Sequence, residues 1–538
     1  MKRQRKCIAV LVEKTSKDYQ AGILRGIYET AFSRDMNVAV FSVTMPRSSD
    51  NYHRGEMTMF TLPNYQKFAG VIYLPDTITF QSRDKDVTEP LVHLARETGL
   101  PVVTIDYKIE GLPCYFCDDS EVVKAMVHHL IDKHGCRDIA YMTGTKGHPH
   151  AEHRLEAFRA AMEESGLPVP DDRTYYGDFW YNEGENFVNS LLESKNGLPD
   201  AIICANGHMA DSVYNALFAK GLHVPRDVRL ASYDEATEKR SFITCTIRRS
   251  ENAGKAACMG LFDIMDGKTV PMRTPVKCDF AENFSLTCGC TAADDYNLNI
   301  FKHDSSDTYN DYFSEFNTVS EALINSKNIR DMLWTASWFT YFLKDFTSIY
   351  ICMCSNVIDS EASFGENIIQ RTYTDTMLIA HSRTNLPDGK HVEYVGTDKK
   401  FPVKDMFPLL FSAEGDPAAY LFRPLHFEDR CFGYVVISYG NKLMAPSDIF
   451  DYWINDLANA IESQRRLAMM SYLYKKMRED AITDLMTGLL NRNGFNLMLP
   501  QLIDEAKAGE SSSLSSWQTL TDLNTSTTHS ATARATRS

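Results

Sequence analysis

The first half of the chain alternates short apolar runs with amphipathic helical segments, and this alternation constrains its fold more than any other feature. The runs lie at residues 7–12, 38–43, 70–74, 102–105, 139–142, 201–204 and 229–232, with helical patterns between most of them. Strands that are apolar on both faces and joined by helical crossovers form parallel sheets covered by helices. The sequence therefore predicts an α/β fold that binds any ligand at the carboxyl ends of its strands.

Seven short motifs follow one another along residues 1–290. They are FAGVIYLP at 68–75, GLPVVTID at 99–106, HHLIDKHG at 128–135, HRLEAF at 153–158, PDAIICAN at 199–206, GLHVPRDV at 221–228 and SYD at 232–234. In order and spacing this series resembles the ligand-binding core of LacI/GalR-type regulators. The resemblance implies a two-lobed type I periplasmic-binding-protein fold for residues 1–290, here without the helix-turn-helix of such repressors.

By position in these motifs, the resemblance places Arg154, Asn206 and Asp234 between the two lobes, in contact with a ligand. Tyr19, after the first strand, is expected to stack on a sugar or base ring. Arginine offers a planar fork, and Asn and Asp bond to the donors and acceptors of a ligand. A sugar- or nucleoside-like small molecule is the expected ligand. The alternative for each residue is a structural role, such as a helix cap or an ion pair.

Two further groups of residues have spacings that occur in metal sites. His148, His150 and His153 share one loop, and Cys114-Tyr-Phe-Cys117 and Cys288-Gly-Cys290 pair cysteines closely. A structural metal needs four converging ligands, and neither cysteine pair has a matching second pair along the sequence. We therefore expect solvated or ligand-contacting histidines, structural thiols, and no bound metal.

Residues 305–446 show a second α+β pattern. A long helical pattern over 312–346 precedes apolar strands at 348–354, 376–380, 418–425 and 432–438. The stretch RPLHFEDRCFGYVVI, at 423–437, is similar to the last hairpin of GAF domains. The resemblance implies a GAF-like sensor domain, and a dimerising spacer remains an equally good interpretation.

A single long helix is predicted over residues 447–482, which contain no Pro or Gly. Ala460, Leu467, Tyr474 and Ala481 recur every seven residues, with Met470 and Met477 offset by three. This spacing predicts a short parallel coiled coil between two chains, and hence a homodimer. The alternative is a helix that packs on its own domain.

Residues 484–495 read DLMTGLLNRNGF and resemble the opening of GGDEF diguanylate cyclase domains. The matching positions are Asp484, Thr487, Gly488, Leu489, Asn491, Arg492 and Phe495. That family makes cyclic di-GMP from two GTP molecules with Mg²⁺. No Gly-Gly-Asp-Glu-Phe follows in this sequence, so residues 483–510 are interpreted as a truncated GGDEF start. We expect no catalytic residues, no cofactor in this chain, and no cyclase activity.

The last segment, residues 511–538, contains 15 Ser or Thr in 28 positions and shows no periodicity. With its codons shifted by one base, it can be translated as VVMADLDGLKHIND, which is similar to the next GGDEF segment. We predict a disordered tail produced by a single-base frameshift near residues 511–513. The alternative is a natural disordered tail.

Composition limits the class of protein. The net charge of −15 and pI near 5.5 argue against direct DNA binding, which needs a basic surface. The sequence has no signal peptide and no apolar run long enough to span a membrane, and its 13 cysteines suggest reduced thiols in the cytoplasm. A periplasmic solute receptor is disfavoured by the missing signal peptide.

We predict a cytoplasmic ligand-sensing signalling protein derived from a ligand-regulated diguanylate cyclase. The alternative is a LacI-like transcriptional regulator that acts without its own DNA-binding domain.

Overall fold

The computed structural model describes residues 4–44, 50–78, 85–234, 243–277, 279–283, 286–290, 318–358, 370–484, 487 and 489–507. The chain divides into two compact units, one of residues 1–355 with 370–458 and the other of residues 356–369 with 459–538. The predicted tail at 511–538 lies outside the described residues.

A 12-stranded sheet forms the centre of the first unit. Its strands, in spatial order, are β11 (Arg273–Lys277), β5 (Cys114–Asp118), β4 (Val102–Ile105), β3 (Gly70–Tyr73), β1 (Cys7–Glu13), β2 (Asn37–Val43), β17 (Ala419–Phe427), β18 (Arg430–Ser438), β13 (Ser348–Cys354), β14 (Thr376–Asn385) and β15 (His391–Val395), and β16 (Lys400–Pro402) pairs with β14. Strands β1 and β2 are buried on both faces apart from Glu13, which is half-buried. Their apolar side chains therefore form the centre of the core.

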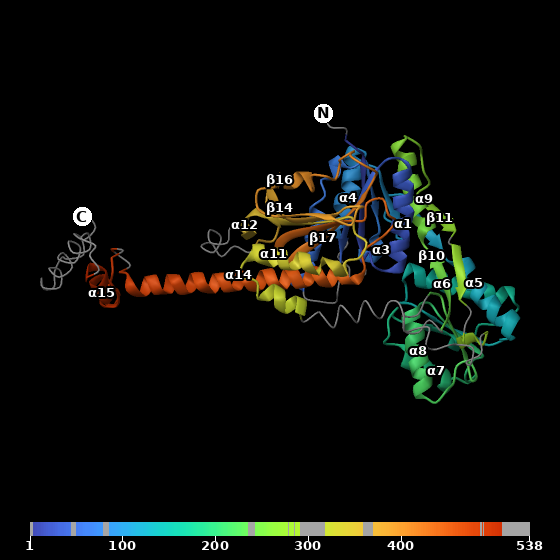
Figure 1. Ribbon diagram of the computed structural model, residues 1–538. Helices are drawn as coiled ribbons and strands as arrows, with labels where there is room; N and C mark the ends of the chain where they lie inside the picture. The colour runs from blue at the N-terminus through green and yellow to red at the C-terminus, as the bar shows by residue number, and fades with distance from the viewer. Residues whose placement is uncertain are drawn as a thin grey trace. The chain divides into compact units, whose positions relative to one another are not determined.

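Helices cover this sheet. They are α1 (Asp18–Ser33), α2 (Asp50–Met57), α3 (Pro75–Ile78), α4 (Lys85–Thr98), α9 (Glu251–Met265) and α11 (Ile329–Trp338). The short helix α12 (Ser355–Ile358) directly follows β13. Figure 1 shows α1 and α9 side by side along the sheet. They pack closely because Gly26 of α1 leaves room for the backbone of α9: a Cβ atom there would lie 2.1 Å from the carbonyl oxygen of Glu251.

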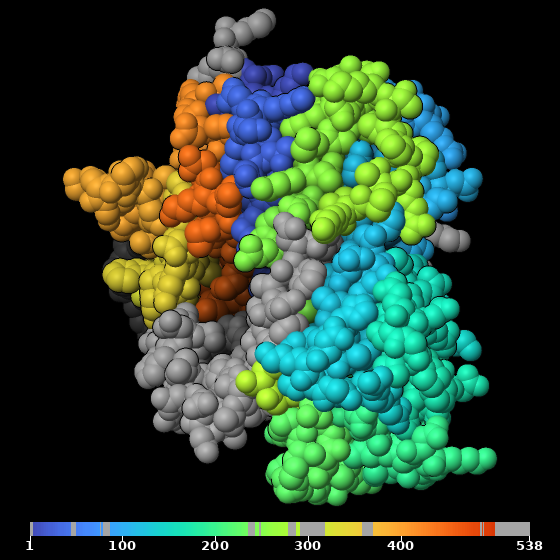
Figure 2. All heavy atoms as spheres, turned by 90° about the vertical axis from the view of Figure 1, so that its right-hand side faces the viewer, coloured from blue at the N-terminus to red at the C-terminus, as the bar shows by residue number. Residues whose placement is uncertain are grey.

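A second sheet of six strands forms the other lobe. Its spatial order is β12 (Asp279–Asn283), β10 (Thr244–Arg249), β9 (Arg229–Ser232), β8 (Ala201–Cys204), β6 (Ile139–Thr143) and β7 (Thr174–Tyr176), packed with α5 (Ser120–His128), α6 (Pro149–Glu164), α7 (Gly184–Glu193) and α8 (Gly207–Ala219). The chain passes between the sheets from β5 to α5, from β10 to α9 and from β11 to β12. Figure 2 shows residues of both lobes at the surface, with α9 and β11 in one and α7 and α8 in the other. The predicted two-lobed α/β fold is confirmed.

The segments that the sequence assigned to separate domains, 1–290 and 305–446, share the first sheet. Strand β17 pairs in parallel with β2, from Ala419 opposite Val38 to Phe422 opposite Phe41. The rings of Phe41 and Phe422 stack with their centroids 4.8 Å apart. Because this pairing is continuous, the first lobe and the module that follows it form one body.

The helical pattern predicted over 312–346 is interrupted in the structure. Residues 312–317 lie outside the described part of the chain, and a break precedes α11, where the side chain of Asn328 accepts a hydrogen bond from the backbone N–H of Asp331 at 2.9 Å. Asn is a strong N-cap residue because its short side chain can satisfy such an amide. The prediction of one long helical pattern thus missed the start of a new helix at Ile329.

Two further helices follow, α14 (Asp448–Ile482) and α15 (Arg492–Lys507). Along the predicted heptad seam Ala460 is buried, whereas four later positions are exposed: Leu467, Met470, Tyr474 and Met477. In the part of the chain that the structure describes, no helix combines the length and apolarity needed to cross a bilayer.

Candidate ligand-binding site beside the hinge

Four parallel strands of the second sheet end at one edge, in the order β7, β6, β8 and β9. The residues that follow them are 177–183 after β7, 144–154 after β6, 205–206 after β8 and 233–234 after β9. Three of the four predicted ligand-binding residues, Arg154, Asn206 and Asp234, belong to these segments. The topology therefore places all three at the edge where α/β sheets bind ligands.

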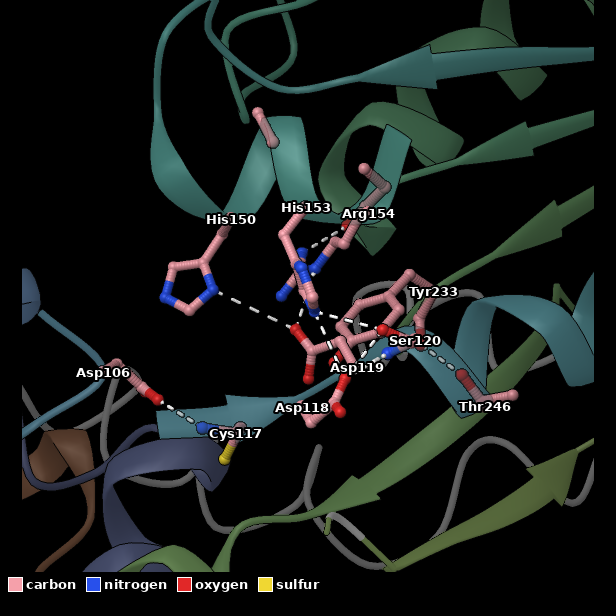
Figure 3. Close-up of polar contacts among 12 residues, drawn as sticks. Asp106, Cys117, Asp118, Asp119, Ser120, His150, His153, Arg154, Tyr233 and Thr246 are labelled. Carbon is pink, nitrogen blue, oxygen red and sulfur yellow. Dashed lines mark hydrogen bonds and ion pairs between the residues drawn. The ribbon is translucent and has the colours of Figure 1, made fainter. Parts of the chain in front are cut away.

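Arg154 lies in the first half of α6 and is buried. Its Nε atom donates to Oδ2 of Asp119 at 3.1 Å, and its Nη1 atom donates to the carbonyl oxygen of Ala205 at 2.8 Å. The guanidinium also lies over the ring of Tyr233, with Cζ 3.7 Å from the ring centroid. Figure 3 shows Asp119, Arg154 and Tyr233 gathered at one point. Arg154 thus combines the ion pair that the sequence offered as its alternative role with a place at the strand ends.

Asp119 follows β5, where the chain passes from the first sheet to the second, and its side chain is fully buried. The neighbouring Asp118 accepts hydrogen bonds from the backbone N–H and the hydroxyl of Ser120, and its Oδ1 lies 3.2 Å from Nε2 of His153. Burial acts to raise the pKa of Asp118, but these contacts hold that pKa below its usual value. The hinge segment is therefore tied to α6 by two adjacent carboxylates (Figure 3).

Asn206 and Asp234 organise the start of α8. The side chain of Asn206 accepts from the backbone N–H of Met209 at 2.9 Å and donates to the carbonyl oxygen of Phe179 at the same distance. Asp234 accepts from the backbone N–H of Gly207 at 2.6 Å. Asn206 is thus the N-cap of α8, and both side chains are partly exposed. Both side chains are therefore oriented by the backbone N–H groups at the start of α8.

An aromatic group lines the same edge. The hydroxyl of Tyr181 lies 2.8 Å from Nδ1 of His208, and Trp180 packs edge-on against both rings. Phe179 packs edge-on against His148, which in turn stacks on His150. Trp180 is 44% exposed and Tyr181 38%. Exposed aromatic rings beside buried polar groups are typical of pockets for ring-shaped ligands.

The three histidines that the sequence assigned to one loop lie instead at the start of α6, with His148 at its N-cap and His150 and His153 within the helix, and they do not converge on one point. His148 contacts aromatic rings, the Nδ1 atom of His150 is 4.0 Å from the carboxylate of Asp119, and His153 bonds to Asp118. Burial lowers the pKa of His208, although Asp234 and Asp211 act in the opposite direction. This edge of the sheet therefore carries a guanidinium group, carboxylates, an amide and uncharged rings.

The remaining predicted residue, Tyr19, lies at the carboxyl end of β1 in the first lobe, in the first turn of α1. Its carbonyl oxygen accepts a hydrogen bond from Ser250, in the second connection between the lobes, at 2.7 Å. Asp106, after β4, has a positive φ of 64° and accepts from the backbone N–H of Cys117 at 2.9 Å. Both residues lie after strands of the first lobe. Tyr19 contacts the connection at Ser250, and Asp106 contacts the end of β5, just before the connection to α5.

Sequence reasoning missed Asp118, Asp119 and the run Phe179–Tyr181. The signals were present: an Asp-Asp-Ser sequence before an amphipathic helix, and three consecutive aromatic residues after a strand. Neither was recognised, because β5 and β7 are short and carry polar residues.

The described residues of the predicted GGDEF start lie in the turn between α14 and α15 and in the first turn of α15. Oδ1 of Asp484 accepts from the backbone N–H and the hydroxyl of Thr487 at 3.0 and 2.8 Å. The side chain of Asn491 donates to the carbonyl oxygens of Ala481 and Thr483. Arg492 begins α15, and the backbone N–H of Phe495 bonds to the carbonyl of Asn491. Leu489 lies within the turn, and Gly488 lies outside the described residues. The described motif side chains thus build a helix–helix connection.

Residues 5–254 match the family model described as periplasmic binding proteins and sugar binding domain of LacI family. Catabolite control protein A of Priestia megaterium is 26% identical over 273 residues, which cover 49% of this chain and 76% of the relative. The ribose operon repressor of Escherichia coli (strain K12) is 30% identical over 245 residues, which cover 44% and 67%. The solved structure of the transcription regulator CcpA of Lactococcus lactis is 17% identical, with a TM-score of 0.40 over 52% of this chain and 99% of that one.

Proposed function

Because this chain belongs to the family of periplasmic binding proteins and LacI-type sugar-binding domains, we propose that residues 5–254 bind a small sugar-like ligand. The protein acts as a regulator that responds to this ligand. The observation that carries the proposal is the meeting of Arg154, Asn206 and Asp234 with the exposed rings of Trp180 and Tyr181 at one edge of the second sheet.

The chemistry of this edge suits a polyhydroxylated ring. Hydroxyl groups both donate and accept hydrogen bonds, so they pair with a guanidinium, a carboxylate and an amide at once. The apolar face of such a ring packs on Trp180 and Tyr181. Since Asp119 and Arg154 join the hinge to the second lobe, a ligand that contacts Arg154 also touches the connection that closure of the lobes must bend. Closure follows only if the ligand binds the two arrangements unequally.

A thermal-shift screen tests the proposal. The full chain is heated with a panel of pentoses, hexoses, sugar phosphates and nucleosides. A ligand at about 100 times its Kd stabilises the fold by about 2.7 kcal/mol, which is visible as a higher melting temperature. Trp180→Ala should weaken binding of the best ligand at least tenfold while leaving the fold intact, because Trp180 is 44% exposed. Trp338→Ala, at 76% exposure on α11, is the matched control.

Arg154→Met removes the guanidinium group from the same site and should also weaken ligand binding. Arg159 lies on the same helix but is exposed, so Arg159→Met should bind the ligand as the wild type does. The proposal fails if no compound in the panel stabilises the wild type. It also fails if the Trp180 variant binds the stabilising compound with unchanged affinity.

The output is proposed to be regulatory, and α14 is proposed to pair two copies of the chain. Four apolar side chains of its heptad seam are exposed, among them Leu467 and Met470, and such a seam is buried when a second helix packs against it. Light scattering should show a dimer that Leu467→Glu with Met470→Glu converts to monomer. Phe218→Glu, at an exposed site on α8, should stay dimeric. A monomeric wild type would refute the pairing.

The relatives named above are a repressor and a catabolite control protein, and these names favour transcriptional control over cyclic di-GMP signalling. With a net charge of −15, the chain is proposed to act through a protein partner, and it should not bind generic duplex DNA at micromolar concentration in low salt. The motif at 484–495 supports a second candidate, a former ligand-regulated diguanylate cyclase whose output helix is α14. Because no Gly-Gly-Asp-Glu-Phe occurs in the sequence, this candidate also predicts no cyclic di-GMP synthesis.

A further inference from the structure

Two histidines and two cysteines meet at the end of the second lobe, away from the candidate ligand site. His129 is the first residue of a π-helical turn, His129–Lys133, that continues α5, and His134 directly follows this turn. Cys288 and Cys290 lie at and just after a short 3₁₀ turn, Leu286–Cys288, that follows β12. The potential ligand atoms of all four side chains lie within 4.8 Å of one another. In Figure 2 the segment at 286–290 lies at the surface beside α5.

We propose that these four side chains bind one Zn²⁺ ion in a tetrahedral Cys₂His₂ site. Nε2 of His129 lies 3.2 Å from Nε2 of His134, and Sγ of Cys290 lies 3.3 and 3.4 Å from the nitrogens of His134 and His129. Zinc bonds of about 2.05 Å to nitrogen and about 2.3 Å to sulfur place two nitrogens about 3.3 Å apart, and nitrogen and sulfur about 3.6 Å apart, in a tetrahedron. The observed separations agree with these values within about 0.3 Å.

The backbone is shaped for this convergence on both sides. Residues five apart on an α-helix point about 140° away from each other, so an ordinary helix cannot direct His129 and His134 to one atom. A π-helical turn, which closes a wider ring, brings such residues back to the same side. On the cysteine side Gly289 has φ of 88°, a conformation that glycine adopts readily.

The surroundings support a fixed site. Cys288 is fully buried and Cys290 partly buried, and Arg229 of β9 donates from Nε to the carbonyl oxygen of Cys288 at 3.1 Å. Two thiolates and Zn²⁺ make a neutral centre with two neutral imidazoles, which a protein interior tolerates. Soft thiolates combined with imidazole in tetrahedral geometry favour zinc over magnesium or calcium.

The sequence led us to expect no metal, because Cys288-Gly-Cys290 has no matching second pair of cysteines along the sequence. The two histidines lie about 150 positions earlier and were not considered as ligands. Folding of the second sheet brings them together. The consequence is mechanical. A zinc ion here ties the residues that follow β12 to the end of α5, so the last described segment of the sensor is anchored to its second lobe.

The test uses full-length, tag-free protein from zinc-supplemented cells, dialysed against metal-free buffer. Elemental analysis should find about one zinc per chain. Replacement with cobalt should give the visible absorption of a tetrahedral site and a thiolate charge-transfer band. Cys290→Ser and His129→Gln should each lose most of the metal. A chelator should lower the melting temperature by several degrees, reversibly on adding zinc, since a ligand bound only to the fold stabilises it.

Two matched variants separate this site from nonspecific binding. His128→Gln changes the half-exposed histidine one residue before His129, and Cys258→Ala removes a buried thiol of α9. Both should keep a full equivalent of zinc. The wild-type cobalt spectrum supplies a result that does not depend on any variant folding. The proposal is overturned by octahedral cobalt, by zinc content that is equal in wild type and His129→Gln, or by a Cys288–Cys290 disulfide in protein purified under reducing conditions.

Discussion

Arg423 holds together a buried polar network that joins the first lobe, the following module and the start of α14. Its Nη2 atom lies 2.7 Å from Oδ1 of Asp451 and donates to the hydroxyl of Thr44 at 2.9 Å. The backbone N–H of Thr44 bonds to Glu56 at 2.6 Å, and the same carboxylate lies 3.2 Å from Nε2 of His426. Arg423→Met should destabilise the first unit, because it leaves buried carboxylates without their shared cation.

The magnitude follows from the titration of Asp451. Burial raises the pKa of Asp451 to about 6, although Arg423 acts to lower it. At pH 7 the ionised carboxylate therefore costs the wild-type fold about 2.8 kcal/mol relative to an unfolded pKa of about 3.9. Without Arg423 the carboxyl group can at worst bind a proton, which costs about 4.2 kcal/mol and adds about 1.4 kcal/mol. Lost hydrogen bonds to Thr44 and Ser42 add about 1–2 kcal/mol, for a total of about 3 kcal/mol.

The raised pKa of Asp451 also makes the penalty depend on pH. A carboxyl group whose pKa is raised in the fold favours folding at low pH, and this contribution is lost as the pH rises from about 4 through about 6. At pH 5 Asp451 is already protonated in the wild type, so its share of the Arg423→Met penalty disappears. The loss should therefore fall from about 3 kcal/mol at pH 7 to about half of that at pH 5.

Urea unfolding followed by tryptophan fluorescence, to which the buried Trp453 contributes, measures both values. Arg371→Met is the control, because its ion pair with Asp429 is largely solvent-exposed on the arginine side and should be worth at most about 1 kcal/mol at either pH. A loss below about 1 kcal/mol at pH 7 for Arg423→Met, or equal losses at the two pH values, would refute the argument.

Three other outcomes are expected. Asp119→Asn should cost about 3 kcal/mol in urea unfolding, because it leaves the guanidinium of Arg154 buried without its charge partner; a loss below about 1 kcal/mol would mean that solvent reaches Arg154. Gly26→Ala should lower stability by about 1–3 kcal/mol, since the new methyl group meets the carbonyl oxygen of Glu251. Glu29→Ala, also on α1, removes a partly exposed ion pair with Lys255 of α9 and should change stability by less than about 1 kcal/mol. Incubation with GTP and Mg²⁺ should yield no cyclic di-GMP by mass spectrometry, and any turnover would show that the catalytic assignment is wrong.

The central strands could be predicted because burial on both faces leaves a clear mark on the sequence. The run at 7–12 became β1 and the run at 201–204 became β8, each nearly or fully buried. The outer strands leave no such mark. Strand β11 reads RTPVK and is largely exposed. An edge strand needs few apolar residues, so its existence depends on its neighbours more than on its own composition.

The joined sheet could not be predicted at all. Residues 38–41 and 419–422 pair across roughly 380 positions, and each segment alone reads as an ordinary buried strand. At the candidate ligand site the position of Arg154 followed from its motif, but its partner Asp119 did not. Which acid meets a given arginine depends on how the hinge enters the second lobe, and no local pattern records that path.

The pairing of β2 with β17 also decides which part of the sensor is able to turn. The first lobe and the following module share one sheet, so they are expected to move together. The six-stranded lobe is the part expected to rotate against them. Under the proposed function, the ligand binds the six-stranded lobe beside its hinge, whereas α14 starts beside the joined sheet, where Asp451 pairs with Arg423. A ligand signal of this kind would have to reach the start of α14 through contacts that the six-stranded lobe makes or breaks as it rotates, because the continuous sheet is expected to move as one piece.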